Sequence, residues 1–289
     1  MQKLGVIGGS GLYEIGGLRD IEEVDLETPF GPPSDRYTTG RLEDVGLVFL
    51  PRHGRGHRLM PTELPFRANI HGMKELGVDC ILALSAVGSM REDIAPGDLV
   101  IIDQFIDRTR QRTEETFFGD GIVAHVHFAD PVCAALAGIA HEAASLAGAT
   151  VHRGGTYLCM EGPQFSTRAE SRLYRSWGVE VIGMTNLQEA KLAREAGICY
   201  STIALATDYD CWHQSEEDVS VEAVLEVLRG NADMARQVIA NAAGLLGGKS
   251  DCHCADSLEL AILTARDAAP PEAIERLRLL LPESWLAKR

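Results

Sequence analysis

The fold of this chain is most clearly indicated by residues 198–212, which read ICYSTIALATDYDCW. The part from Ile198 to Ala206 is apolar on both faces, as expected for a strand in a sheet that is covered on both sides. Directly after it come Asp208 and Asp210, whose i, i+2 spacing places both carboxylates on one side of an extended chain. Such aspartates form turns about as often as they form sites. A calcium site is less favoured, because no oxygen-rich loop surrounds them.

Similar apolar segments recur along the chain and alternate with helical patterns. Strand-like runs lie at residues 4–7, 47–50, 80–84, 99–102 and 179–182, and helical periodicity at 64–76, 131–146, 167–177, 187–196 and 220–246. The alternation predicts an α/β fold with a largely buried sheet flanked by helices. A glycine-rich break at residues 247–251 divides the chain. We expect one domain over 1–248 and a C-terminal appendage over 249–289, helical around 272–281 and packed on the same domain.

Composition narrows the functional classes. The 289 residues carry a formal net charge of −15 and include 45% hydrophobic residues. The charge argues against nucleic acid or an anionic membrane as a partner. The apolar run at 80–86 is too short to span a bilayer, and the first strand begins almost at the N-terminus, which leaves little room for a targeting peptide. We therefore expect a cytoplasmic protein.

Three familiar nucleotide and hydrolase motifs fail here. The glycines after the first strand do not complete G-x-G-x-x-G, because the closing position is Glu14. The P-loop pattern that would end in Lys249 and Ser250 has alanine at 243 in place of its first glycine. A nucleophile elbow at Ser10 would need glycine at position 12, which is Leu12. Dinucleotide, ATP and serine-hydrolase sites are therefore disfavoured.

Polar groups nevertheless follow several strands, where ligands of α/β sheets gather. Residues 8–11 (GGSG) can bare backbone N–H groups, which suits a phosphate as well as a tight turn. Arg52 and His53 follow the next strand and offer donors to phosphate oxygens, although a solvated basic loop has the same composition. Residues 84–89 (LSAVGS) and 182–186 (IGMTN) end two further strands with hydroxyl groups.

The seven cysteines predict no metal site. Five of them lie in apolar contexts that are typical of reduced, buried thiols. Cys252 and Cys254 are separated by a single residue, whereas paired zinc ligands are usually two to four residues apart. A redox pair and an ordinary loop both remain open.

The motifs occur in a characteristic order along the chain. Residues 8–11 (GGSG), 52–54 (RHG), 85–89 (SAVGS), 161–166 (EGPQFS), 184–185 (MT) and 207–212 (TDYDCW) together resemble the methylthioadenosine phosphorylase branch of the trimeric purine nucleoside phosphorylases. The resemblance covers roughly residues 3 to 245 and implies the mixed, twisted sheet of that fold. It carries nothing over to the C-terminal appendage.

The resemblance also implies roles for individual residues. It places Ser10, Arg52, His53, Ser85, Ala86 and Thr185 around phosphate. It sets Phe165 and Met184 beside the nucleoside and Ser166 near the base. Asp208 and Asp210 would be the catalytic pair on the purine N7 and 6-amino edge. Val221, Val224 and Leu225 would wrap the 5′-methylthio group, and His125 would come from a neighbouring subunit. One departure is Gly183, a larger polar residue in some relatives, which we expect to leave space beside the ribose.

The activity that the resemblance implies is phosphorolysis of 5′-methylthioadenosine to adenine and 5-methylthioribose 1-phosphate, a step of purine and methionine salvage. It needs no metal or cofactor, since phosphate is a co-substrate, and it implies a homotrimer or a dimer of trimers. Three alternatives stay open: a 6-oxopurine or methylthioinosine phosphorylase, a hydrolase that uses water, and a non-catalytic nucleoside or phosphate sensor. Carboxylates at 208 and 210 favour a 6-amino purine, because a carboxylate repels a 6-oxo group unless it is protonated.

Overall fold

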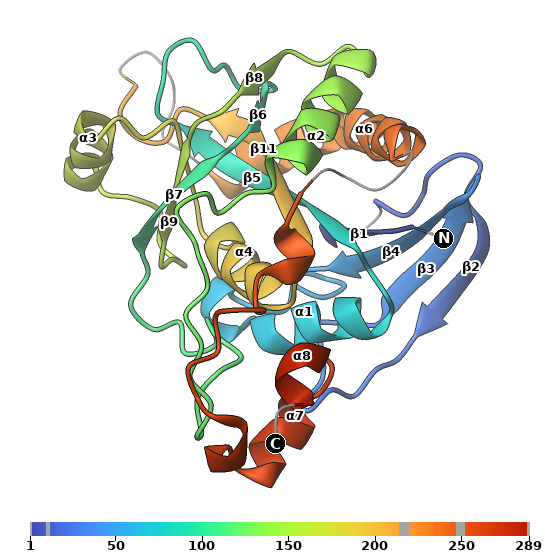
Figure 1. Ribbon diagram of the computed structural model, residues 1–289. Coiled ribbons are helices and arrows are strands. Elements are labelled where there is room, and N and C mark those ends of the chain that lie inside the picture. Colours follow the sequence, from blue (N-terminus) through green and yellow to red (C-terminus); the bar gives the residue numbers. More distant parts are fainter. Residues whose placement is uncertain (1, 10–11, 214–219, 247–251, 288–289) are drawn as a thin grey trace.

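A computed structural model describes residues 2–9, 12–213, 220–246 and 252–287 (Figure 1). Eleven strands of this described chain form one sheet: β1 (Lys3–Gly8), β2 (Arg19–Val24), β3 (Tyr37–Leu42), β4 (Val45–Pro51), β5 (Cys80–Ser89), β6 (Leu99–Ile101), β7 (Gln104–Arg108), β8 (Val151–Arg153), β9 (Thr156–Met160), β10 (Val181–Gly183) and β11 (Cys199–Asp208). The helices are α1 (Phe66–Glu75), α2 (Ala134–Leu146), α3 (Arg168–Ser176), α4 (Asn186–Glu195), α5 (Val221–Gly230), α6 (Ala232–Leu245), α7 (Pro271–Leu277) and α8 (Glu283–Leu286).

The sheet is mixed, as expected, and it branches at β5. Its main path runs β2-β3-β4-β1-β5-β10-β9-β7, while β11 pairs with β5 and β6, and β8 pairs with β6. The pairs β1–β4, β1–β5 and β5–β11 are parallel, whereas β10 and β6 join antiparallel to β5 and β11. The two longest strands, β5 and β11, therefore form the spine of the sheet.

The parallel strands bring their carboxyl ends to one edge of the sheet. Gly8 at the end of β1 pairs with Pro51 at the end of β4, and Gly88 in β5 pairs with Asp208 at the end of β11. The polar segments that follow these strands in the sequence are thus neighbours in space. This is the edge where ligands bind in α/β sheets.

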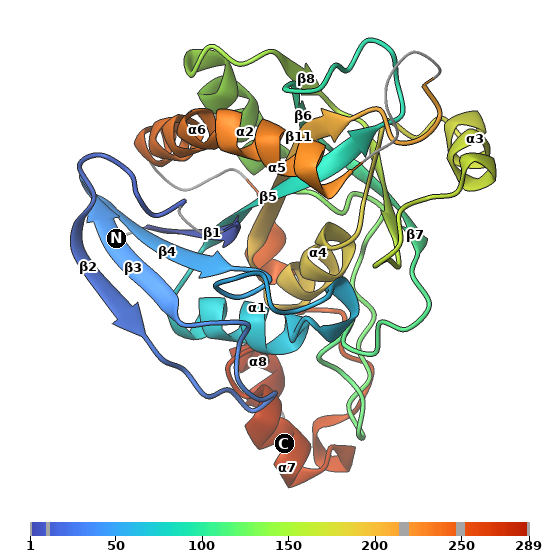
Figure 2. The same ribbon diagram turned by 180° about the vertical axis from the view of Figure 1, so that it is seen from behind.

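Helices cover both faces of the sheet (Figures 1 and 2). On one face, Leu136 and Ala140 of α2 pack with Val238 and Ile239 of α6 against the buried side chains of β1, β4 and β11. On the other face, α1 and α4 share a second hydrophobic cluster with the opposite sides of the same strands. Cover on both faces explains why these strands read as continuous apolar runs.

The strands that the apolar pattern does not predict are short or polar. The strand β2 has the sequence RDIEEV and is almost wholly exposed, so it lacks the alternation that marks a half-buried strand. The predicted helix over 220–246 is wrong in one respect, because it is interrupted at Asn231, between Gly230 and Ala232. A glycine followed by asparagine has low helix propensity, which accounts for the break.

The C-terminal segment adds side chains to an existing core. Ile274, Leu277 and Trp285 belong to the same hydrophobic cluster as Phe66 and Ile70 of α1, and α7 and α8 lie beside α1 in both ribbon views. We propose that this segment unfolds together with the rest of the chain. No helix among the described residues is long and apolar enough to span a membrane.

Replacement of Leu277 by alanine tests this proposal. Leu277 is fully buried, so its loss leaves a cavity and lowers the free energy of unfolding by about 2–5 kcal/mol. Leu279→Ala is the matched control, since Leu279 is 43% exposed, and it shifts the urea midpoint far less. Both variants should unfold in one transition by circular dichroism and tryptophan fluorescence. An early partial transition in Leu277→Ala would show instead that the segment is a separate unit.

Candidate active site

A cavity of about 700 Å³ opens at the carboxyl edge of the sheet. Its wall contains residues from the ends of all five predicted polar strands, including Gly8, Arg52, Ser85, Thr185 and Asp208. Residues of α5 and α6 also line it. The predicted polar groups therefore converge on one space large enough for a small molecule.

Arg52 forms a buried ion pair at the inner end of this cavity. Its Nε and Nη2 both donate to the carboxylate of Glu189 in the first turn of α4, with an Nη2–Oε2 distance of 3.1 Å. The same guanidinium donates to the carbonyl oxygens of Leu84 (2.9 Å) and Ile7 (3.4 Å). Burial alone would lower the pKa of Arg52, but the adjacent Glu189 carboxylate outweighs it and raises that pKa.

This pairing limits what Arg52 can offer a ligand. Of the five N–H donors of a guanidinium, four already have partners among the described residues. One Nη1 proton is left for the cavity. Arg52 can thus make a single charge-assisted contact rather than the two-pronged grip that its sequence context suggests.

His53 faces the cavity in its neutral form. Burial lowers the pKa of its imidazole to about 4, so the ring carries no charge near neutral pH. Its Nδ1 lies 2.8 Å from the carbonyl oxygen of Leu59, which can only accept, so the proton is assigned to Nδ1. His53 therefore presents Nε2 as an acceptor and not, as expected from sequence, as a second donor.

The N-terminus of α4 adds a positive pole to the same region. Thr185 precedes Asn186, the first residue of α4, and within the described chain its side chain makes no capping hydrogen bond to that helix. The Thr185 hydroxyl and the helix dipole are therefore available to an anion in the cavity. Ser85 and Ala86 of β5 lie in the same wall, and the Ser85 hydroxyl lies 3.3 Å from the Ala86 carbonyl oxygen. Ser10 lies outside the described residues.

Asp208 and Asp210 line the cavity together, but not through strand alternation. The β5–β11 register shifts between Ala206 and Asp208, and Asp210 has a left-handed backbone with φ of 52°. The Asp210 N–H donates to Asp208 Oδ1 at 2.7 Å, and the Thr207 hydroxyl donates to Oδ2 at 2.7 Å. Asp208 thus forms a turn and still faces the cavity, so the two readings of this pair are compatible.

Burial sets the protonation of both carboxyl groups. It raises the pKa of Asp208 against the hydrogen bonds from Thr207 and Asp210, and the negative charge of Asp210 pushes in the same direction. Burial also raises the pKa of Asp210, whose two oxygens lie 2.9 and 3.0 Å from the Ser166 hydroxyl. The pair therefore favours holding a proton more strongly than two exposed aspartates would.

Two glycines control the space around this pair. A Cβ atom at Gly88 would lie 3.1 Å from Asp208 Oδ1 and 3.3 Å from Asp210 Cβ, so glycine lets β5 approach both aspartates. The expectation that Gly183 leaves room for a ligand is wrong. A Cβ atom at Gly183 would lie 2.0 Å from the hydroxyl of the fully buried Tyr157, which already fills that space.

The remaining predicted residues divide between the cavity and its surroundings. Phe165, Met184, Val224 and Leu225 line it, and the first of these is 43% exposed. Ser166 is not among the described lining residues and acts on Asp210 instead. Val221 is 58% exposed and also lies outside the described lining, as does the exposed His125. The apolar wall continues to Leu228, which belongs to the apolar pattern of α5, and to three residues outside that helix: Leu12, Met234 and Val238.

Comparison with known proteins identifies a matching family and similar relatives. A family model described as the phosphorylase superfamily matches residues 3–243. An S-methyl-5′-thioadenosine phosphorylase from Geobacter sulfurreducens is 62% identical over 280 residues, which cover 97% of this chain and 98% of that protein.

The chain belongs to the S-methyl-5′-thioadenosine phosphorylase family of the phosphorylase superfamily.

Solved structures agree with this phosphorylase in fold as well as in sequence. A methylthioadenosine phosphorylase from an antarctic soil metagenomic library superimposes with a TM-score of 0.92 at 49% identity, covering 97% of this chain and 99% of that one. A methylthioadenosine phosphorylase from Schistosoma mansoni, solved in complex with adenine, gives a TM-score of 0.81 at 37% identity over 86% of this chain and 93% of the other.

Sequence reasoning on this phosphorylase missed Glu189 and Tyr157. Glu189 lies 137 positions from Arg52 in the sequence, and it belongs to a segment whose pattern predicts an ordinary amphipathic helix. The amphipathic pattern alone therefore does not indicate that its carboxylate is buried. Asn186 and Tyr200 also donate to its carboxylate, at 3.5 and 2.8 Å. An acidic residue on the apolar face of a predicted helix was the one available signal, because buried charges are nearly always paired.

Glu189→Gln should destabilise this phosphorylase strongly. The change leaves the buried guanidinium of Arg52 without its counter-charge, at a cost of about 3–5 kcal/mol in the free energy of unfolding. The double variant Arg52→Met/Glu189→Met removes both charges and should recover a large part of that loss. Glu23→Gln is the control, because Glu23 belongs to an exposed ion pair with Arg36. Equal urea midpoints for Glu189→Gln and Glu23→Gln would contradict this role of the pair.

Proposed function

We propose that this chain catalyses the phosphorolysis of 5′-methylthioadenosine, which yields adenine and 5-methylthioribose 1-phosphate. Membership of the methylthioadenosine phosphorylase family supports this activity. The observation that supports it most directly is a single cavity that has hydrogen-bond donors for an anion at one end and two carboxyl groups at the other. Arg52, Thr185 and the start of α4 suit an anion, while Asp208 and Asp210 suit a purine edge.

Phosphate occupies the end near α4 in this proposal. The free Nη1 proton of Arg52, the hydroxyls of Thr185 and Ser85, and the N-terminus of α4 donate to its oxygens. The neutral His53 accepts a hydrogen bond at Nε2 from the protonated oxygen of a hydrogen phosphate ion. An ion that carries one proton thus matches a site with several donors and one acceptor. Ser10 and the Ala86 backbone complete this part of the proposed site.

The purine occupies the other end. Breaking the glycosidic bond moves its electron pair onto the ring, and a proton delivered at N7 stabilises the departing base. Asp208 supplies that proton in this proposal, and burial favours this role because it raises the pKa of the Asp208 carboxyl group. Asp210, fixed by Ser166, accepts from the 6-amino group. Asp208 and Asp210 are therefore the catalytic pair of this proposal. Phe165 and Met184 contact the nucleoside in the part of the cavity between the aspartates and the phosphate.

The reaction balances without any further co-reactant. The bond from N9 to C1′ breaks, and the phosphate oxygen that faces the positive C1′ forms the new bond. Adenine gains the proton of Asp208, and the proton that the hydrogen phosphate ion loses replaces it on the enzyme. A site that bound water in place of phosphate would not need these anion donors, which argues against a hydrolase.

The apolar wall favours a 5′-methylthio group over a hydroxyl. Val224 and Leu225 of α5 line the cavity, and Leu228 continues the same face. A 5′-hydroxyl against this wall would lose its hydrogen bonds to water without replacement. We therefore expect adenosine to be a poorer substrate than methylthioadenosine. Val221 contributes to this wall only if it is covered in the assembled protein.

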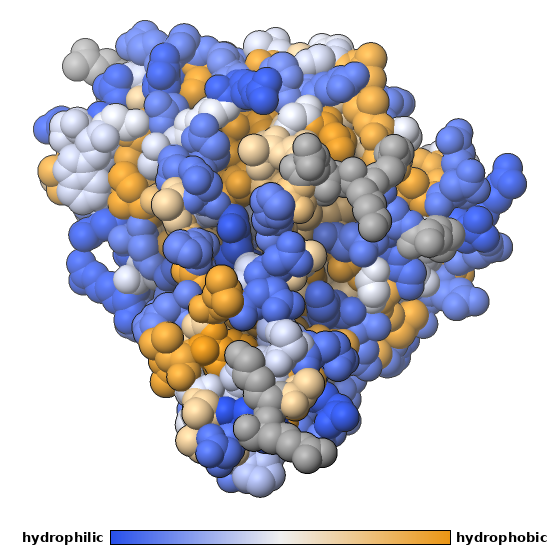
Figure 3. Space-filling model, in the orientation of Figure 1, coloured by the Kyte–Doolittle hydropathy of each residue, from blue (hydrophilic) through white to orange (hydrophobic). Residues whose placement is uncertain are grey.

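A homotrimer, or a dimer of such trimers, is part of the proposal. His125 is exposed, and beside it Val123, Leu260 and Leu263 are exposed hydrophobic residues on two segments bridged at Ala124 and Ile262. Hydrophobic side chains also gather on the lower left of the face in Figure 3. Exposed apolar patches of this kind mark protein interfaces. We propose that a neighbouring subunit covers this patch and receives His125 in its cavity, and that the enzyme works in the cytoplasm.

Phosphate-dependent release of adenine tests the activity directly. Adenine should appear from methylthioadenosine only when phosphate is present, together with 5-methylthioribose 1-phosphate. Adenosine should release adenine more slowly, and methylthioinosine should release its own base, hypoxanthine, more slowly. Chromatography of the products measures all three. Free methylthioribose formed without phosphate would show a hydrolase, and tight binding with no adenine release would show a sensor.

Asp208→Asn tests the purine end. Loss of the proton donor should lower kcat for methylthioadenosine by about 10²–10⁴-fold. In Asp210→Asn, the amide at the 6-amino edge can donate to a 6-oxo group, so the relative use of methylthioinosine should rise in that variant. Asp93→Asn, which changes an aspartate paired with Arg91 away from the described cavity lining, should leave both rates unchanged. An unchanged kcat in Asp208→Asn, or an unchanged substrate preference in Asp210→Asn, would overturn the assignment.

A further inference from the structure

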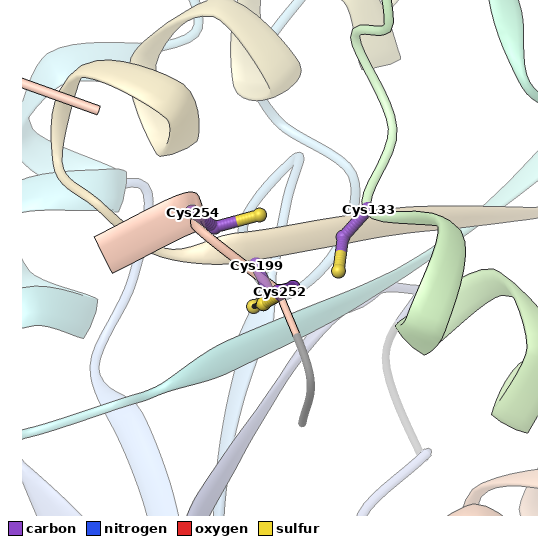
Figure 4. A group of neighbouring side chains, drawn as sticks. All are labelled: Cys133, Cys199, Cys252 and Cys254. Carbon is purple, nitrogen blue, oxygen red and sulfur yellow. Dashed lines mark hydrogen bonds between the residues drawn. The ribbon is translucent and has the colours of Figure 1, made fainter. Parts of the chain in front are cut away.

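Four cysteines from three separate segments meet near the amino end of β11 (Figure 4), at the opposite end of this strand from Asp208. They are Cys133, directly before α2; Cys199, the first residue of β11; and Cys252 and Cys254, at the start of the C-terminal segment. Their four Sγ atoms all lie within 4.8 Å of one another. We call this set the four-cysteine cluster.

The spacing of these sulfur atoms fits a shared ion. Cys199 Sγ and Cys252 Sγ are 3.3 Å apart, well beyond the about 2.05 Å of a disulfide bond. In a tetrahedral zinc site with Zn–S bonds of about 2.3 Å, neighbouring sulfurs are about 3.8 Å apart. That value lies between the 3.3 Å of this pair and the 4.8 Å limit within which all four Sγ atoms fall, so small side-chain rotations would place all four sulfurs around one centre.

The short spacing of Cys252 and Cys254 is no obstacle in this arrangement. The backbone at His253 has φ of −103° and ψ of 21°, and a 3₁₀ turn begins at Cys254. This turn directs both thiols to one side, while the His253 side chain is 97% exposed and points away. The expectation of no metal site took Cys252 and Cys254 as the one candidate ligand pair and interpreted the two distant cysteines that complete the set as ordinary buried thiols.

The surrounding structure holds the C-terminal segment in position for the cluster. A Cβ atom at Gly197, which has φ of +64°, would lie 3.0 Å from the carbonyl oxygen of Ala255. The turn between α4 and β11 therefore packs directly on this segment. The Ser257 hydroxyl donates to the carbonyl oxygen of Arg194 at 2.6 Å. Three of the four cysteine positions are thus fixed by strands, helices and close packing rather than by the cluster itself.

We propose that the four-cysteine cluster binds one Zn²⁺ ion as a structural site. Four thiolates fill the coordination shell and leave no open position for a substrate, which is the pattern of structural zinc. Each thiol releases its proton on binding, so no oxidant or reductant is needed. Two disulfides would require an oxidant and shorter distances between the sulfur atoms. Soft thiolate ligands in tetrahedral geometry select zinc over the hard cations Mg²⁺ and Ca²⁺.

The place of the cluster gives the ion a function separate from catalysis. Cys199 begins β11 and Asp208 ends it, so about 30 Å of strand separates the cluster from the purine end of the cavity. The ion would join the start of the C-terminal segment to α2 and β11. Closing such long loops restricts the unfolded chain and stabilises the folded one.

Zinc content measured on the purified full-length chain tests the proposal. Inductively coupled plasma and native mass spectrometry should find about one zinc ion per chain, and both Cys254→Ser and Cys252→Ser should lose it. Cys80→Ser is the matched control. Cys80 is a buried cysteine that pairs in register with Cys199 but lies outside the cluster. The control should keep its zinc and its melting temperature.

If a variant fails to fold, measurements on the wild-type protein still test the proposal. Stripped with a chelator and reloaded with Co²⁺, the wild-type protein should show the thiolate-to-metal charge-transfer bands of a tetrahedral cobalt site, and its melting temperature should rise on adding Zn²⁺. Adenine release at saturating substrate should not depend on zinc. A chain that stays free of zinc after exposure to it, an intact mass lower by two disulfides, or zinc retained by Cys254→Ser would each overturn the proposal.

Discussion

One buried guanidinium holds the architecture of the active site together. Arg52, at the end of β4, donates to the backbone of β1 at Ile7 and of β5 at Leu84, and to Glu189 in α4. Removing two charges from water is costly, and only complete hydrogen bonding offsets that cost. The pair therefore fixes the relative position of three strand ends and one helix, which is the geometry that every other group in the cavity depends on.

The same pair shapes the electrostatics of the cavity. Glu189 neutralises most of the charge of Arg52, so a bound anion is met by hydrogen-bond donors and a helix dipole more than by a free positive charge. A neutral His53 fits this balance, since it adds an acceptor and no charge. In a chain with a net charge of −15, such a site selects its anion by geometry at close range, because long-range attraction is absent.

The sequence predicted the helices and strands well, and the contacts between distant side chains poorly. Continuous apolar runs indicate buried strands such as β11, and parallel pairing then brings the polar ends of these strands together. What it could not supply were contacts between distant positions: Glu189 with Arg52, Tyr157 over Gly183, and Cys133 with Cys254. The tautomer of His53 is a similar case, because it is set by one carbonyl oxygen. Local pattern determines which element forms, whereas tertiary packing decides which side chains meet.

The two ends of β11 have different roles: the carboxyl end carries groups of the active site, and the amino end is held by packing contacts. Its carboxyl end carries the aspartates, whose raised pKa values depend on burial in a partly open cavity. Its amino end is held among α2, the α4–β11 turn and the C-terminal segment. A carboxyl group stays buried, at a cost in free energy, only if the strand that carries it does not unfold locally, because local unfolding would rehydrate the group. Contacts at the amino end of β11 stabilise the strand against local unfolding. They lie far from the cavity, so they do not block a substrate.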